Sequence, residues 1–194
     1  MNDRGFTLIE ALTVVTIISI LAVALAYTYS GWMGKYRVES TIKTIHADLL
    51  DARQRALMRD REYFADFNQP PPPANKGSYR IIEDSNNNGV LYSPAAPTIE
   101  VGNNVLRSFP KVVDYPITWA AGSISFDEKG IIQPSVTPLG ATLCIFTDFD
   151  GDGTSDFDPD YDCIVISPMR LQLGKLTLQN TAGGTCSAAN CVTK

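Results

Sequence analysis

The stretch RGFTLIEALTVVTIISILAVALA, residues 4–26, decides how this chain is built. It opens a run from Ala11 to Gly34 in which 24 consecutive residues carry no charge. About 20 apolar residues cross a bilayer as a helix, so the run is long enough to span a membrane. Glu10 stands at the head of the run, where a carboxylate inside the bilayer costs roughly 3 kcal/mol. The sequence therefore predicts a membrane helix whose carboxylate needs a partner.

Two of three competing interpretations explain the apolar run but not its details. One is a plain membrane anchor. The other is a secretory signal peptide, cut after the small residues Ala24–Ala26 and before Tyr27. The start MNDRG carries one Arg and one Asp in place of a basic region, and a carboxylate precedes the apolar core. Both features disfavour the signal peptide.

The third interpretation accounts for Gly5 and Glu10 together. The segment RGFTLIE, residues 4–10, resembles the processing site of type IV prepilins and type II secretion pseudopilins. The resemblance implies a leader peptide over residues 1–5, cleavage between Gly5 and Phe6, and N-methylation of Phe6. It also implies that Glu10 serves subunit assembly by pairing with the new Phe6 amino group of a neighbour. The alternative is that Glu10 lies at headgroup level and is solvated.

The pattern after Gly34 becomes amphipathic without a helix break. Apolar residues recur at three- and four-residue spacing, which is typical of a helix with one buried face. No proline occurs before Pro70, so we expect one helix over residues 6–68, with about residues 11–34 transmembrane. It would be roughly 90 Å long. His46 lies beside the apolar stripe, where we expect a structural residue and not a ligand. The stripe comprises Val38, Ile42, Ile45, Leu49, Ala52 and Ala56.

A proline-rich linker, QPPPPANKG at residues 69–77, is expected to stop the helix. Beyond it, short β-like runs alternate with turns and no helix intervenes, which favours antiparallel pairing over residues 78–194. DEKG at residues 127–130 is expected to form a hairpin turn. The fold class is therefore α+β, a long N-terminal helical spine packed on an antiparallel β-sheet domain. The expected strands are 78–82, 90–93, 104–109, 116–120, 123–126, 130–133, 141–146, 163–167 and 171–178.

Three further segments resemble the GspH/FimT-type minor subunits of the same family. They are LLDARQRALMRDREY at residues 49–63, ISFDEKGIIQP at residues 124–134 and CIVISPMRLQLGKL at residues 163–176. The resemblance implies that the first segment ends the helix, the second forms a turn before the final strands, and the third supplies the closing strand.

The four cysteines lie in the last third of the chain and show no CxxC spacing, which favours two disulfides over a zinc site. Disulfides persist outside the reducing cytosol. Three pairings are possible. We expect Cys144–Cys163 and Cys186–Cys191 because each closes a short loop, the first contributing roughly 3 kcal/mol.

The acidic stretch TDFDGDGTSDFDPDYDC, residues 147–163, fits the first half of a calcium loop. Hard oxygens recur at alternating positions before Gly153, but Pro159 stands where an EF-hand needs its bidentate Glu. We expect structural Ca²⁺ here, with Asp158 or Asp160 completing the shell. The alternative is a solvated acidic hairpin loop. The candidate ligands are Asp148, Asp150, Asp152, Thr154 and Asp156.

A second stretch, EDSNNNG at residues 83–89, shows the same spacing more weakly. Asp84, Asn86 and Asn88 alternate before Gly89, but Tyr92 and Ala95 occupy the later ligand positions. A hairpin turn is the favoured interpretation here, and calcium is the alternative.

The bulk composition limits the classes of function. The net charge of −5 and the pI of about 4.8 disfavour nucleic acid as a partner. The single histidine, His46, disfavours a His-based catalytic site, and no nucleophile or phosphate-loop motif occurs. We therefore expect a protein that is not an enzyme.

The resemblance implies a structural minor pilin or pseudopilin that assembles into a type II secretion pseudopilus or a type IV pilus after leader cleavage. The expected partners are other pilin subunits, the prepilin peptidase and methylase, and the inner-membrane assembly platform. The expected location is the inner membrane, single-pass, with the C-terminal domain in the periplasm or on an extracellular filament. The alternatives are a tip-located module that binds a surface or takes up DNA, and a membrane-anchored or secreted protein with an ordinary signal peptide.

Overall fold

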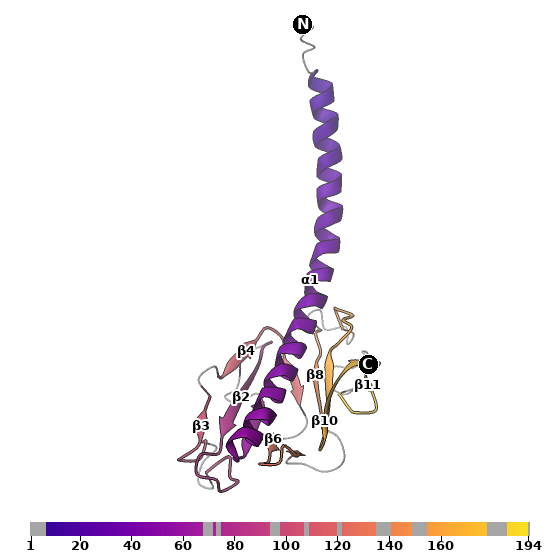
Figure 1. The fold of residues 1–194 in the computed structure, drawn as a ribbon. Coiled ribbons are helices and arrows are strands. Elements are labelled where there is room, and N and C mark those ends of the chain that lie inside the picture. The colour runs from indigo at the N-terminus through magenta and orange to yellow at the C-terminus, as the bar shows by residue number, and fades with distance from the viewer. Residues whose placement is uncertain are drawn as a thin grey trace.

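A computed structural model describes residues 7–67, 72, 75–93, 98–106, 109–119, 122–134, 141–148, 155–177 and 186–193. Within these residues one helix, α1 (Leu8–Arg59), packs across two antiparallel sheets (Figure 1). The amino-terminal half of α1 projects beyond the β domain, and its carboxyl-terminal half lies against the strands (Figure 1). The α+β class predicted from the sequence is confirmed.

The 52 residues of α1 form the spine predicted from the sequence, but the helix ends nine residues earlier than expected. Asp60 takes a left-handed conformation (φ 53°), and its N–H bonds back to the Ala56 carbonyl. This cap turns the chain so that the next residues enter the first sheet as β1 (Tyr63–Phe67). The expected boundaries at residues 68 and 78 are therefore wrong, because the β domain begins at Tyr63.

The two halves of α1 differ completely in burial. All six residues of the predicted apolar stripe are at most 1% exposed, which confirms the amphipathic interpretation. Within the described part of the chain, no helix combines the length and mean hydropathy that a membrane span requires. In the projecting half, ten large apolar side chains are 46–86% exposed, namely Leu8, Ile9, Leu12, Val14, Val15, Ile17, Ile18, Ile20, Leu21 and Val23.

The first sheet has six strands. Its main order is β3 (Asn104–Val105), β2 (Gly77–Glu83), β1, β6 (Ser123–Phe126) and β7 (Ile132–Pro134). β4 (Lys111–Val113) also pairs with β2: β3 pairs with the end of β2 at Ile82 and Glu83, and β4 pairs with its start at residues 77–79. Every residue of β1 is buried, so this central strand shows no alternation of polar and apolar residues.

The second sheet has five strands in the order β11 (Cys191–Thr193), β10 (Arg170–Leu176), β9 (Cys163–Ser167), β8 (Ala141–Ile145) and β5 (Ile117–Trp119). The predicted hairpin turn at residues 127–130 joins β6 to β7. The predicted strand at residues 90–93 is reduced to one isolated bridge between Tyr92 and Ile99. Val90 instead lies in a loop, where its N–H donates to Asn88 Oδ1 and its carbonyl accepts from Asn103 Nδ2.

The main core lies between the buried stripe of α1 and both sheets. Leu49 and Ile45 of the helix, Tyr63 and Phe126 of the first sheet and Ile164 of the second are all completely buried. One core thus joins the helix to both sheets, and the projecting half of α1 contributes nothing to it.

Candidate functional site

Thr7 and Glu10 cap the amino-terminal end of α1 by exchanging hydrogen bonds. Thr7 holds the N-cap position, and its hydroxyl oxygen accepts from the Glu10 N–H at 3.4 Å. Glu10 Oε2 accepts from the Thr7 N–H at 2.9 Å and from the Thr7 hydroxyl at 2.7 Å. This is the reciprocal capping box that a Thr-x-x-Glu sequence can form. The predicted assembly residue is thus exposed and held by its own chain, while Gly5 and Phe6 lie outside the described residues.

The apolar surface that follows Glu10 surrounds the helix. The exposed side chains include neighbours in sequence, such as Val14 with Val15 and Ile17 with Ile18, so they cannot share one face. A helix that is apolar on all sides is typical of a segment buried in a large core or in a membrane. Nothing in the described part of the chain covers this surface.

Gly34 marks the point where α1 meets the β domain. A Cβ added there would lie 2.0 Å from the ring of Phe157, whereas one added at Gly31 meets nothing within 4 Å. The ring of Phe157 also packs edge-on against Tyr115, with ring centroids 6.3 Å apart. The helix can approach the second sheet this closely because residue 34 has no side chain.

Arg53 joins the three segments that resemble the GspH/FimT-type subunits. It lies in the first segment, its Nε donates to the Gly130 carbonyl of the second at 2.7 Å, and its Nη1 donates to the Met169 carbonyl of the third at 3.1 Å. His46 Nε2 similarly lies 3.2 Å from the Leu171 carbonyl, so this residue is structural as predicted. The three segments can be recognised in the sequence, but their connection through one guanidinium could not be predicted from it.

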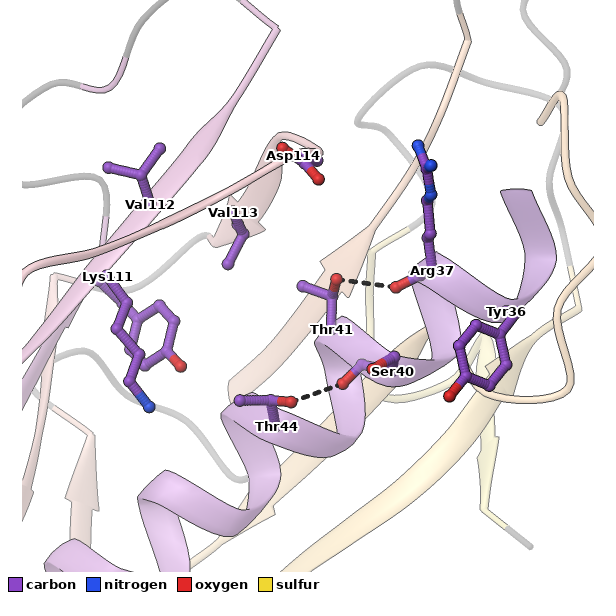
Figure 2. Close-up of a pocket in the computed structure, with 10 residues that line it drawn as sticks. Tyr36, Arg37, Ser40, Thr41, Thr44, Lys111, Val112, Val113 and Asp114 are labelled. Atoms are coloured by element: carbon purple, nitrogen blue, oxygen red, sulfur yellow. Dashed lines mark hydrogen bonds between the residues drawn. The ribbon is translucent and has the colours of Figure 1, made fainter. Parts of the chain in front are cut away.

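A groove of about 530 Å³ lies between the polar face of α1 and β4 (Figure 2). The hydroxyls of Thr41 and Thr44 bond back to helix carbonyls (Figure 2). Lys111 Nζ lies 2.6 Å from Asp48 Oδ2, and the Tyr79 hydroxyl donates to the same oxygen at 2.5 Å. Burial raises the pKa of Tyr79, so this hydroxyl stays protonated. These groups therefore bind one another.

The disulfides differ from the predicted pairing. The bonds are Cys144–Cys186 and Cys163–Cys191, with Cα–Cα distances of 5.8 and 6.1 Å. Cys144 and Cys163 are direct neighbours on β8 and β9, yet each bonds to the carboxyl-terminal segment. The expectation failed because the fold brings the carboxyl-terminal segment against β8 and β9, so each of their cysteines meets a sulfur of that segment and not the cysteine nearest along the chain. Both bonds therefore fasten the carboxyl-terminal segment to the second sheet.

The geometry of the predicted calcium ligands at residues 148–156 is only partly described. Asp148 and Asp156 are in the described region, whereas Asp150, Asp152 and Thr154 lie outside it. Among the described residues, no group of three or more His, Cys, Asp or Glu side chains is arranged to hold a metal ion. Calcium at this loop stays a prediction.

Two nearby aspartates already have protein partners. Asp158 Oδ1 lies 2.6 Å from Lys175 Nζ, and their hydrogen bond raises the pKa of this lysine. The main-chain N–H of Asp160 donates to Glu39 Oε1 at 2.9 Å. Asp158 is thus engaged in an ion pair, and the N–H of Asp160 ties the acidic loop to α1.

Comparison with known proteins bears on the amino terminus alone. Residues 1–26 match a family model described as the prokaryotic N-terminal methylation motif. No curated protein and no solved structure matches the chain. The matched range contains Gly5, Phe6 and Glu10. The motif indicates a membrane-associated, type IV pilin-like protein that is a substrate of the prepilin peptidase and has pilin subunits as partners.

Proposed function

We propose that this chain is a structural minor subunit, a minor pilin or pseudopilin, of a type II secretion pseudopilus or a type IV pilus. After cleavage between Gly5 and Phe6, the projecting half of α1 would hold the subunit in the inner membrane and later pack in the filament core. The β domain would then lie in the periplasm or on the filament surface. The assigned role is assembly, with no catalytic step.

The observation that carries this proposal is the exposed apolar half of α1. Fully burying one large aliphatic side chain contributes roughly 1.5–3 kcal/mol. Ten such side chains lie 46–86% exposed between Leu8 and Val23, so their combined burial would be on the order of the 5–15 kcal/mol that stabilises a typical folded domain. An exposed apolar surface of this size indicates that lipid or the helices of other subunits cover it.

Glu10 would give this packing its register. In the isolated chain its carboxylate is occupied locally by Thr7 through Oε2. Cleavage would leave the amino group of Phe6 one residue before the cap, where it could meet the carboxylate of a neighbouring subunit. A carboxylate in an apolar helix bundle costs free energy unless a cation pairs with it. Pairing between subunits would therefore favour one axial offset over others.

The GspH/FimT-type assignment is part of the proposal. Its support is the position of Arg53, which connects all three segments that carry the resemblance. The projecting helix and the methylation motif support the broader pilin-like role independently. The partners would be other pilin subunits, the peptidase and methylase, and the assembly platform.

Intact mass and amino-terminal sequencing of protein from the native host test the processing step. A mature chain that begins with N-methylated Phe6 is the expected result. A chain beginning at Tyr27 would show an ordinary signal peptide, and one beginning at Met1 would show an unprocessed anchor. Either result would overturn the proposal.

A matched pair of Glu10 variants separates assembly from helix capping. Glu10→Gln retains an acceptor for the Thr7 donors and so preserves the capping box, but it removes the charge. Glu10→Ala removes both. We expect incorporation into native filaments to fall at least tenfold in both variants, as measured by immunoblotting sheared filaments against membrane-bound subunit. Normal incorporation of Glu10→Gln, together with failure of Glu10→Ala, would assign Glu10 to capping alone.

A further inference from the structure

A polar loop joins the end of β2 to the segment that returns as β3, at the end of the domain farthest from the projecting helix (Figure 1). Glu83 on β2 pairs with Asn104 on β3. The strands are antiparallel, so the same register carried one step further places Asp84 opposite Asn103. The two side chains thus come from segments that face one another at the mouth of the loop.

Both side chains hold a buried oxygen that has no hydrogen-bond donor among the described residues. Asp84 is completely buried, and its Oδ2 accepts from the Gly89 N–H at 2.7 Å while its Oδ1 has no partner. Asn103 donates through Nδ2 to the Val90 carbonyl at 2.7 Å, which fixes the amide orientation, and its Oδ1 has no partner. Buried acceptors without donors are costly and rare. Because the register sets Asp84 opposite Asn103, one species bound between the two segments can satisfy both oxygens.

The surrounding charge is negative. The Asp84 N–H donates to the Glu62 carbonyl at 2.9 Å, and a Cβ on Gly89 would lie 3.3 Å from Glu62 Oε2. On the other side, Glu100 accepts from Asn88 Nδ2 at 2.9 Å. The arginines at the loop engage other groups: Arg61 donates to the Ser85 carbonyl, and Arg59 and Arg61 lie 2.9 and 3.9 Å from the Glu83 carboxylate.

The geometry points to a Ca²⁺ site in which Asp84 Oδ1 and Asn103 Oδ1 bind the ion. All candidate metal ligands are oxygen atoms, which this hard cation prefers. The order Asp84, Asn86, Asn88 and Gly89 has the alternation of a calcium-binding loop, and the glycine adopts a positive φ of 72°. One carboxylate and one amide, with water completing the shell, make a weak site. Its Kd should be on the order of 10⁻⁴–10⁻³ M, as in extracellular modules.

A bound water that donates to both oxygens is the rival occupant, and Asp84→Asn distinguishes the two. The variant keeps an acceptor for the Gly89 N–H and adds an N–H that can donate to Asn103 Oδ1. It should therefore fold and be at least as stable as the unsubstituted chain in EGTA. When binding at the acidic loop has been removed by Asp148→Asn, Asp150→Asn and Asp152→Asn, calcium at a hundred times Kd should lower the unfolding equilibrium constant about a hundredfold, and adding Asp84→Asn should abolish this effect.

The experiment uses the full chain in detergent, with calcium titrations followed by thermal unfolding and calorimetry. Binding at the acidic loop is removed first by a background variant that carries Asp148→Asn, Asp150→Asn and Asp152→Asn. In this background we expect one equivalent of Ca²⁺ to bind, and adding Asp84→Asn should abolish it. Absence of binding in the background variant, or binding that survives Asp84→Asn, would overturn the site.

Asn103→Asp provides a test in the opposite direction. A second carboxylate should strengthen calcium binding about tenfold. The calcium-free chain should be destabilised by repulsion with Asp84 and by loss of the hydrogen bond to the Val90 carbonyl. Unchanged affinity in this variant would overturn the assignment of Asn103 as a ligand.

Discussion

The guanidinium of Arg53 holds the turn at Gly130 by a 2.7 Å hydrogen bond from Nε to the main-chain carbonyl. Nη1 of the same side chain donates to Met169 in the turn between β9 and β10. Gly130 has a positive φ of 69°, and a Cβ there would lie 3.0 Å from Leu57, so the turn also packs closely on the helix. One side chain on the last turns of α1 therefore fixes a turn from each sheet.

Replacing Arg53 should destabilise the domain more than replacing its neighbour. Arg53→Ala removes two charge-assisted hydrogen bonds to main-chain carbonyls, and we expect a loss of about 2–4 kcal/mol in the free energy of unfolding. Arg55→Ala is the control, because among the described residues Arg55 forms its ion pair with Asp51 one turn earlier on the exposed face, and the variant should cost less than about 0.5 kcal/mol. Urea unfolding of the full chain measures both values. Equal losses in the two variants would contradict the role given to Arg53.

The sequence predicted the spine because a helical period of apolar residues runs unbroken from Val38 to Ala56. It did not predict where the helix ends. Asp60 caps α1 in a left-handed conformation with no glycine or proline to signal it, and β1 shows no alternation because it is buried on both faces. The helix propensity of residues 60–68 thus predicted a longer helix, whereas the pairing of residues 63–67 in the first sheet ends it at Arg59.

The site was predictable only where its signal is local. Gly5, Phe6 and Glu10 lie within six residues, so their spacing could be compared directly with a processing motif. The Cys163–Cys191 bond and the placement of Asp84 opposite Asn103 depend on how distant segments align in the folded sheets. Register is set by pairing in the folded sheet, which residue spacing along one chain does not encode.

Gly174 leaves room for the Cys163–Cys191 disulfide to pass over β10. It pairs with Cys163 on one side and Thr193 on the other, and an added Cβ would lie 2.7 Å from Cys191 Sγ and 2.7 Å from the Val192 carbonyl oxygen. Gly174→Ala should displace β11 and leave part of the protein with free thiols, since all four cysteines are otherwise bonded. Loss of this 28-residue link costs about 3.5 kcal/mol on the chain-entropy model.

Thiol titration under denaturing, non-reducing conditions measures the Gly174 effect, and unfolding gives the stability. The paired variant Cys163→Ala/Cys191→Ala sets the scale for complete loss of the bond. A Gly174→Ala protein with no free thiol and unchanged stability would show that β11 accommodates the methyl group.

Gly31 and Gly34 should respond oppositely to the same substitution. Gly34→Ala places a methyl group in the Phe157 ring, which also packs edge-on against Tyr115, and should cost about 1–3 kcal/mol. Gly31→Ala meets no neighbouring atom and should stabilise the helix by up to about 1 kcal/mol. Thermal unfolding of the full chain in detergent compares them. A stabilising Gly34→Ala would mean that α1 does not press on Phe157 at this point.

Tyr92 should make the stability of the domain fall at high pH. Its hydroxyl donates to Asp66 Oδ2 at 2.6 Å, and burial followed by this hydrogen bond raises the pKa of Tyr92 to about 12. The unfolded pKa is about 10, so the folded state holds the proton more tightly. The contribution of Tyr92 to stability is therefore complete below pH 10 and lost progressively between pH 10 and 12.

The variant Tyr92→Phe lacks this contribution at every pH. We expect it to be about 1.5–3 kcal/mol less stable at pH 8, with the deficit shrinking as the pH rises. Arg80 still binds Asp66 in the variant, at 2.9 and 2.7 Å, so no buried charge is left alone. Urea unfolding at several pH values measures the difference, in which the titration of other tyrosines cancels. A deficit that stays constant from pH 8 to 12 would show that the Tyr92 proton is not held by folding.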